Sequence, residues 1–268
     1  MFSSWFLVLK LNCMEKIALV TGATSGIGEA TALKLAEEGF AVIITGRRQD
    51  RLNVLKHKLE RGGSSVFTLC FDVRNEEEVN NSLENLPPEW QDIDVLVNNA
   101  GLAAGMEPFQ QGDSVDWNRM IDTNLKGLLF VTRFVSQSMV VRKKGHIINI
   151  GSIAGKEAYP NGNVYCATKH AVDALTKGMR FDLLPYNIKV TQICPGAVET
   201  EFSVVRFHGD KHRADKVYEG YECLVADDIA ECIWFAVSRP SHVNINDMVV
   251  MPTAQASASV FQKEIYPS

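Results

Sequence analysis

The segment Thr21-Gly22-Ala23-Thr24-Ser25-Gly26-Ile27-Gly28 decides the fold. It follows an apolar run over residues 16–20 and leads directly into a stretch whose apolar residues recur at helical spacing. Glycines permit a tight turn, and the unpaired N–H groups at the start of a helix attract a diphosphate. A strand, such a loop and a helix in this order are typical of a dinucleotide-binding fold. The alternative is an ordinary turn between a strand and a helix that binds nothing.

The rest of the chain alternates short β-branched runs with longer amphipathic stretches. Helical spacing is clear over residues 29–38 and 50–61. Most of the apolar runs are almost continuously apolar, as expected when helices cover both faces of a sheet. We therefore predict an α/β fold, a single-domain Rossmann fold whose doubly wound parallel sheet has about seven strands. The expected strands are residues 16–20, 41–45, 65–72, 93–98, 145–150, 189–193 and 247–251.

Composition excludes several classes of protein. The 268 residues carry 27 Lys and Arg against 32 Asp and Glu, a formal net charge of −5. Nucleic-acid-binding proteins usually show a clustered basic excess, so we expect no nucleic-acid partner. Six cysteines are scattered without a CxxC pair or a zinc-finger spacing, so we expect no metal.

Residues 1–13 precede the first expected strand and contain a short apolar run over residues 5–9. The run is too short to span a bilayer, which takes about 18 apolar residues, and no basic residue precedes it as in a signal peptide. We expect a mis-assigned start, an added extension or an N-terminal packing segment, followed by one domain over residues 14–268. No membrane partner and a cytoplasmic location are expected.

The end of the second expected strand, Thr45-Gly46-Arg47-Arg48, indicates which dinucleotide binds. A ribose 2′-hydroxyl is usually bound by Asp or Glu about 20 residues beyond the glycine loop, whereas a 2′-phosphate is bound by Arg. Two guanidinium groups can hold a phosphate, and no carboxylate follows until Asp50. We predict NADP(H) rather than NAD(H). The alternative is two solvated arginines at the start of a helix.

Ser152, Tyr165 and Lys169 form the expected reaction site. Ser152 follows the fifth expected strand, and Tyr165 and Lys169 are four residues apart, on one face of a helix. A neighbouring ammonium lowers the pKa of a phenol from its ordinary value of about 10, so the pair can exchange a proton with a substrate oxygen. Tyr and Lys at this spacing are more often an exposed helical pair. The strand and serine before them favour catalysis.

The glycine loop, Asn98-Asn99-Ala100-Gly101, Ser152, the Tyr165–Lys169 pair and Pro195-Gly196 resemble, in this order, the short-chain dehydrogenase/reductase family over residues 14–255. The resemblance implies that Tyr165 is the catalytic acid and base and that Ser152 orients the substrate oxygen. It implies that Lys169 lowers the pKa of the tyrosine and binds the nicotinamide ribose.

The resemblance also implies roles that the residues alone do not suggest. Asn124, otherwise a polar residue within a helix, supports a proton-relay water, and the protein forms a homotetramer. Cofactor contacts are implied for the glycine loop, for Asp72 and Val73 at the adenine, for Asn99, and for Pro195, Gly196, Val198 and Thr200 near the nicotinamide.

Three further segments are similar to one branch of that family, the NADP-dependent 3-hydroxy acid dehydrogenases, also described as serine or L-allo-threonine dehydrogenases. They are Gly105-Met106-Glu107-Pro108, Val205-Arg206-Phe207 and residues 242–246. This similarity implies small-molecule substrates: a 3-hydroxy acid, a β-hydroxy amino acid, or a semialdehyde such as malonic semialdehyde. The alternatives are a reductase of 3-oxoacyl thioesters or broad-range ketones, and a non-catalytic NADPH-sensing regulator.

Such substrates carry a carboxylate, for which Arg206 is the candidate ligand because a guanidinium matches the fork of a carboxylate. The alternative is a surface arginine in a polar stretch. Glu107 could meet a substrate amino group, although a solvated carboxylate is the simpler interpretation. Buried or hydrogen-bonded packing roles are expected for His146, His170, Cys166 and Cys194.

Overall fold

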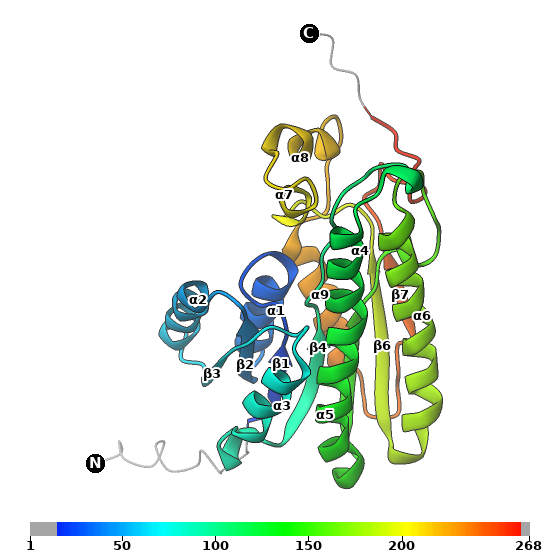
Figure 1. Cartoon of the computed structure of the whole chain (residues 1–268). Coiled ribbons are helices and arrows are strands. Elements are labelled where there is room, and N and C mark those ends of the chain that lie inside the picture. Colours follow the sequence, from blue (N-terminus) through cyan, green and yellow to red (C-terminus); the bar gives the residue numbers. More distant parts are fainter. Residues whose placement is uncertain (1–14, 264–268) are drawn as a thin grey trace, which may run out of the picture.

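Seven strands form one parallel sheet in the computed structural model, which describes residues 15–263 (Figure 1). The strand order is β3-β2-β1-β4-β5-β6-β7, and every neighbouring pair is parallel. The order reverses at β1, which is the predicted doubly wound Rossmann topology. The strands are β1 (Ile17–Val20), β2 (Ala41–Gly46), β3 (Val66–Cys70), β4 (Ile93–Asn98), β5 (Gly145–Ile150), β6 (Ile188–Pro195) and β7 (Asp247–Val250).

All seven predicted strands are confirmed; the carboxyl ends of β3 and β6 differ from the prediction by two residues, and the other differences are of one residue. β3 stops before Asp72, because the backbone turns there and the Asp72 carboxylate accepts from the Arg74 N–H at 3.0 Å. β6 continues to Pro195 because it still pairs with Val250 of β7. The predicted N-terminal extension, residues 1–13, lies outside the described residues, and the domain boundary there stays a prediction.

Helices cover both faces of the sheet (Figure 1). One face carries α1, α2 and α9, and the other carries α3, α5 and α6. α7 and α8 lie beyond the carboxyl ends of the strands, beside the end of α1. The helices are α1 (Gly26–Glu37), α2 (Gln49–Arg61), α3 (Glu76–Glu84), α4 (Ser114–Ile121), α5 (Leu128–Arg142), α6 (Asn163–Leu183), α7 (Phe202–Arg206), α8 (Lys211–Tyr218) and α9 (Ala226–Val237).

The strands divide the core between the two faces. Successive side chains of a strand point to opposite sides, so Ile44 packs with Leu35 and Ile229 on one face, whereas Ile43 packs with Ile147 on the other. These five side chains are fully buried. The sheet is therefore a rigid platform, and the loops at the carboxyl ends of its strands converge over one edge.

His146 lies in this core, at the start of β5, and is 4% exposed. Its Nε2 lies 2.8 Å from Thr191 Oγ1, and among residues 15–263 its Nδ1 has no hydrogen-bond partner. Burial lowers the pKa of His146 to about 3, and the nearby charge of Lys189 acts in the same direction. The prediction of a buried packing histidine is confirmed. His170 is exposed and hydrogen-bonds through Nδ1 to the Cys166 carbonyl at 2.9 Å.

The pKa of His146 predicts an acid-sensitive fold. Below pH 6.5 the unfolded chain binds a proton at this ring that the folded chain does not bind until about pH 3. We expect this residue to reduce the free energy of unfolding by up to about 1.4 kcal/mol for each pH unit below its unfolded pKa. The change His146→Asn should remove one proton from that slope, measured by urea unfolding between pH 7 and 4.

The matched control is His57→Asn, since the His57 side chain is 72% exposed. This control should keep the wild-type slope. A His146→Asn variant whose stability falls with acid as steeply as the wild type would contradict the assignment.

Candidate active site

A cavity of about 730 Å³ opens at the carboxyl ends of the strands. Its volume lies in the range typical of ligand sites, about 300–1,000 Å³. The predicted site residues that line it are Gly22, Thr24, Ser25, Gly26, Ile27, Arg47, Arg48, Asp72, Val73, Asn99, Ser152, Tyr165, Lys169, Pro195, Gly196, Val198, Thr200 and Arg206. Ala23, Gly28 and Asn124 are buried behind this lining.

The glycine loop makes the turn between β1 and α1. Gly22 has a φ of +66°, a conformation that L side chains rarely adopt, and a Cβ there would lie 2.9 Å from Ala100 Cα. Asn99 fixes the loop from the neighbouring strand, because its Nδ2 donates to the Thr21 carbonyl at 2.9 Å. The N-terminus of α1 therefore faces the cavity with unpaired N–H groups, a suitable position for a diphosphate.

Arg48 is held at this end of the cavity by several oxygens. Its Nη2 donates to Thr24 Oγ1 at 2.7 Å and to Ser25 Oγ at 3.1 Å, and its Nη1 lies 3.3 Å from Glu201 Oε2. Arg51 Nη1 reaches the same carboxylate at 2.7 Å. Burial works against ionisation of Glu201, but the two arginines hold its pKa below the usual range. Glu201 and Arg51 were not predicted from the sequence, because they are 150 residues apart along the chain and meet only in the fold.

Arg47 lies beside Asp72, with its Nη1 3.6 Å from Asp72 Oδ2. Arg74 Nη2 contacts the same oxygen at 2.5 Å. Burial opposes ionisation of Asp72, but the two arginines hold its pKa below the usual range. The Arg47 and Arg48 side chains are 50% and 41% exposed, so they are neither buried nor simply solvated arginines. They could bind a phosphate that enters the cavity.

Ser152, Tyr165 and Lys169 come together at the end of β5 and on α6. They are 9%, 8% and 7% exposed. Ser152 Oγ lies 3.4 Å from the Pro195 carbonyl and accepts from the Ala154 N–H at 3.1 Å, and Lys169 Nζ donates to the Ile150 carbonyl at 2.8 Å. The structure thus brings together the serine, phenol and amine that the sequence predicted.

Burial has the largest effect on the protonation of this group. Burial raises the pKa of Tyr165 above its usual range, and the proximity of Tyr159 adds to the effect, whereas Ser152 and the charge of Arg206 oppose it. Burial lowers the pKa of Lys169 to about 8. The predicted lowering of the Tyr165 pKa by Lys169 stays a prediction, since the Lys169 ammonium here bonds to the Ile150 carbonyl.

Asn124 lies in a π-helical turn (Asp122–Gly127), not within a regular helix. It is 2% exposed, its Oδ1 accepts from the Leu102 N–H at 2.8 Å, and its Nδ2 donates to the Leu102 carbonyl at 2.8 Å and to Thr168 Oγ1 at 3.1 Å. π-Turns within helices are common at functional sites. Asn124 ties the loop after β4 to α6 and lies behind the lining of the cavity.

Arg206 ends α7 and lies close to Tyr165. Its Nη1 donates to Tyr159 Oη at 3.0 Å, its Nε donates to the Gly105 carbonyl at 3.3 Å, and its Cζ is 5.7 Å from the centre of the Tyr165 ring. The interpretation as a surface arginine is therefore wrong.

Tyr159 was not predicted as a site residue, because nothing in the sequence around it marks it. Glu107 is half-buried, and its Oε2 accepts from the Met106 N–H at 2.7 Å, so it is not a solvated carboxylate.

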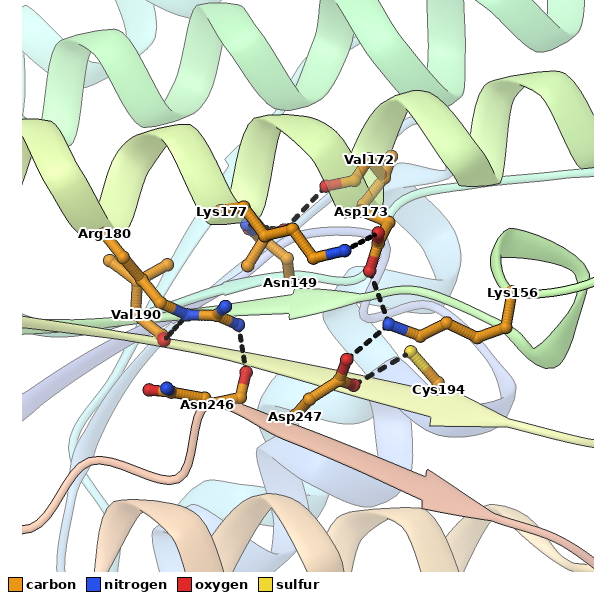
Figure 2. Close-up of polar contacts among 11 residues, drawn as sticks. Asn149, Lys156, Val172, Asp173, Lys177, Arg180, Val190, Cys194, Asn246 and Asp247 are labelled. Carbon is orange, nitrogen blue, oxygen red and sulfur yellow. Dashed lines mark hydrogen bonds and ion pairs between the residues drawn. The ribbon is translucent and has the colours of Figure 1, made fainter.

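A charged network joins the segment after β5 to α6 and β7 (Figure 2). Lys156, which follows the short turn Ile153–Gly155, bonds to both Asp173 of α6 and Asp247 of β7. Cys194 Sγ donates to Asp247 Oδ1 at 3.4 Å. Burial raises the pKa of Cys194 to about 12, which agrees with the predicted packing role. Cys166 is also buried, and its thiol pKa is raised for the same reason.

Residues 15–263 contain no group of three or more His, Cys, Asp or Glu side chains placed to hold a metal ion. None of the helices described is both long and apolar enough to cross a bilayer.

Comparisons with known proteins agree with this geometry. The chain is 49% identical over 245 residues to the NADP-dependent 3-hydroxy acid dehydrogenase YdfG of Salmonella typhi, which covers 91% of this chain and 98% of that protein. It is 43% identical over 244 residues to sulfoacetaldehyde reductase 2 of Chromohalobacter salexigens, covering 91% of this chain and 96% of that protein.

A solved structure of similar fold is the closed form of serine dehydrogenase complexed with NADP+. It superposes with a TM-score of 0.88 at 46% identity, over 94% of this chain and 100% of that one. The family described as short chain dehydrogenase matches residues 16–210. The seven-stranded fold, the assembled Ser152–Tyr165–Lys169 group and these similarities lead to one conclusion: the chain belongs to the short-chain dehydrogenase family.

Proposed function

We propose that this protein is an NADP(H)-dependent oxidoreductase acting on carbon 3 of short 3-hydroxy acids or β-hydroxy amino acids such as serine and L-allo-threonine, or on the matching semialdehyde or keto acid. One observation carries the proposal. A single cavity is lined by the glycine loop, by Arg47 and Arg48, by the Ser152–Tyr165–Lys169 group and by Arg206. The relatives whose names include these activities cover nearly the whole chain.

NADP(H) is the cofactor, and it supplies or accepts the hydride when bound. The residues present fit its parts. The N-terminus of α1 suits the diphosphate, and Arg47 and Arg48 suit the 2′-phosphate. The other proposed contacts are Asp72 and Val73 at the adenine, Asn99 and Lys169 at the sugar, and Pro195, Gly196, Val198 and Thr200 at the carboxamide.

Tyr165 exchanges the proton that accompanies the hydride. Because burial raises its pKa, the phenol keeps its proton at neutral pH and can donate it to the oxygen of a carbonyl substrate. Ser152, which lines the same cavity as Tyr165, orients that same oxygen. Lys169 holds the cofactor sugar, and Asn124 supports the water that returns the proton.

Arg206 binds the substrate carboxylate. Its Nη2 is buried, and among residues 15–263 it meets no hydrogen-bond acceptor. Buried donors are nearly always paired, so an unpaired guanidinium N–H beside the reaction centre favours an anionic ligand. A cytoplasmic location and a homotetramer stay predictions.

A second candidate is a reductase of an aldehyde that carries a different anion. The similarity to sulfoacetaldehyde reductase 2 favours it, because a sulfonate also accepts hydrogen bonds from a guanidinium. Oxidation of NADPH with malonic semialdehyde, acetoacetate, sulfoacetaldehyde and a 3-oxoacyl thioester separates the candidates. A protein that oxidises NADPH only with the thioester would refute the proposed substrate class.

The variant Tyr165→Phe tests the proton transfer. Removal of a general acid typically costs about 10²–10⁴-fold in rate, so kcat should fall by at least about 100-fold. The dissociation constant of NADPH, measured by fluorescence titration, should change little. The control is Tyr186→Phe, since Tyr186 is exposed and does not line the cavity; this variant should behave as wild type. Near-normal turnover by Tyr165→Phe would end the proposal.

The double variant Arg47→Gln, Arg48→Gln tests the choice of cofactor. A hydrogen bond to a charged group contributes about 1.5–3 kcal/mol, so the KM for NADPH should rise by at least about tenfold, and far more than the KM for NADH. Arg61→Gln is the matched control, because Arg61 is an exposed arginine at the end of α2 that does not line the cavity. Equal losses with both cofactors would refute the phosphate site.

The variant Arg206→Ala tests the carboxylate site. The KM for 3-hydroxybutyrate should rise by at least about tenfold, and much more than the KM for 2-butanol, which has no charge for the arginine to bind. The control is Arg213→Ala, an exposed arginine whose Cζ lies 4.5 Å from the centre of the Phe207 ring. If selectivity between the two alcohols is unchanged in Arg206→Ala, the carboxylate binds elsewhere.

A further inference from the structure

Tyr159 lies beside the reaction centre and takes no part in the roles assigned so far. It comes after the turn Ile153–Gly155 and six residues before Tyr165. It is half-buried, lines the same cavity as Ser152 and Tyr165, and packs against the apolar cluster that contains Tyr165. A ligand bound to the catalytic phenol therefore has Tyr159 as a near neighbour.

The hydroxyl of Tyr159 has a free proton to donate. In its bond with Arg206 Nη1, at 3.0 Å, the tyrosine oxygen is the acceptor. Burial raises the pKa of Tyr159 above its usual range, with Arg206 acting in the opposite direction, so the phenol stays protonated at neutral pH. Its O–H can therefore donate to a ligand while its oxygen keeps the bond to Arg206.

Hydrogen bonds hold the Arg206 guanidinium in one position, and they therefore fix the direction in which its unpaired Nη2 group donates. The Gly105 carbonyl accepts from its Nε at 3.3 Å, and the Gly105 N–H donates to the Arg206 carbonyl at 3.0 Å. Its Cζ lies 5.5 Å from the centre of the Tyr159 ring and 5.7 Å from that of Tyr165, over both aromatic faces. Its Nη2 remains without an acceptor in the described chain.

Two donors without an acceptor in the described chain thus lie near Tyr165: the Arg206 Nη2 group and the hydroxyl of Tyr159, whose oxygen bonds to Nη1 of the same guanidinium. A carboxylate has two oxygens with outward lone pairs, so one small anion can accept from both donors. An uncharged amide of the same size has one acceptor oxygen instead of two and no negative charge, so it cannot offer a separate charged oxygen to each donor.

We propose that Tyr159 is a specificity-determining residue, whose hydroxyl donates to one oxygen of the substrate carboxylate while Arg206 Nη2 donates to the other. This inference rests on the proposed function, because it assigns a second ligand to the same anion. The ligand class is a short carboxylate whose 3-oxygen reaches Tyr165. Since the carboxylate does not react, the bond forms equally in the bound substrate and the transition state, and its loss raises KM more than it lowers kcat.

The test measures binding of butyrate and of its uncharged isostere butyramide to the NADP+-loaded protein by calorimetry. We expect the wild type to bind butyrate more tightly, and Tyr159→Phe to reduce that preference by about tenfold or more. The control Tyr186→Phe should keep the wild-type preference. In turnover, the KM for 3-hydroxybutyrate should rise by a similar factor in Tyr159→Phe.

Direct contact is distinguished from an effect through Arg206 by combining the two substitutions. If Tyr159 donates to the carboxylate itself, Arg206→Ala retains some preference for butyrate, and adding Tyr159→Phe removes it. No further loss in the double variant would overturn the direct contact. Equal weakening of butyrate and butyramide in Tyr159→Phe would overturn it too, because it would reveal a packing role.

The same measurements separate this proposal from the proposed reaction. A wild type that prefers butyrate through Tyr159, but oxidises no 3-hydroxy acid, would support the carboxylate clamp and refute the reaction. A wild type that oxidises 3-hydroxybutyrate, with Tyr159→Phe unchanged in KM and in butyrate preference, would refute the clamp alone.

Discussion

The contact between the Gly155 backbone and the Lys169 backbone fixes the geometry on which the reaction centre depends. A Cβ at Gly155 would lie 2.7 Å from the Lys169 carbonyl oxygen, so any side chain there would push the turn away from α6. Ser152 precedes this turn, and α6 carries Tyr165 and Lys169. Lys156 adds a charged bond from the same turn to α6 and β7 (Figure 2). Misplacement of catalytic groups by about 1 Å can cost 10²-fold in rate, so this close approach serves the chemistry as well as the fold.

At the cofactor end of the cavity, ion pairs and hydrogen bonds hold the charged side chains in position. Arg48 is fixed by Thr24 and Glu201 before any phosphate arrives. A guanidinium already held in position loses less side-chain entropy when it binds an anion. Glu201 places a negative charge near the expected phosphate, and Arg51, which shares its carboxylate, offsets that charge. Glu201 directly precedes α7, so this ion-pair group joins the start of the segment that ends in Arg206 to α2.

The fold could be predicted because strands and helices each leave a pattern of apolar residues within a short stretch of sequence. Most of the apolar runs that form the strands are nearly continuous, and the glycine loop marks the turn into α1. The spacing of Tyr165 and Lys169 likewise places both on one face of α6. The π-turn that contains Asn124 could not be predicted, because one such turn within a helical stretch leaves no distinct pattern of apolar residues in the sequence. Tyr159 and Glu201 gave no signal, since each acquires its partner only through a contact between distant segments.

Burial acts on the Tyr165 pKa in the direction opposite to the one that sequence spacing predicted for Lys169. Spacing reveals that a cation is near, but not how far water is excluded, and desolvation is the larger effect here. Arg206 is one of the charges that favour the phenolate. If Arg206 also binds a carboxylate, as proposed, the bound anion offsets this charge and the phenol holds its proton more firmly. The substrate would then keep Tyr165 in the protonated form, which is the form required to donate to a carbonyl oxygen.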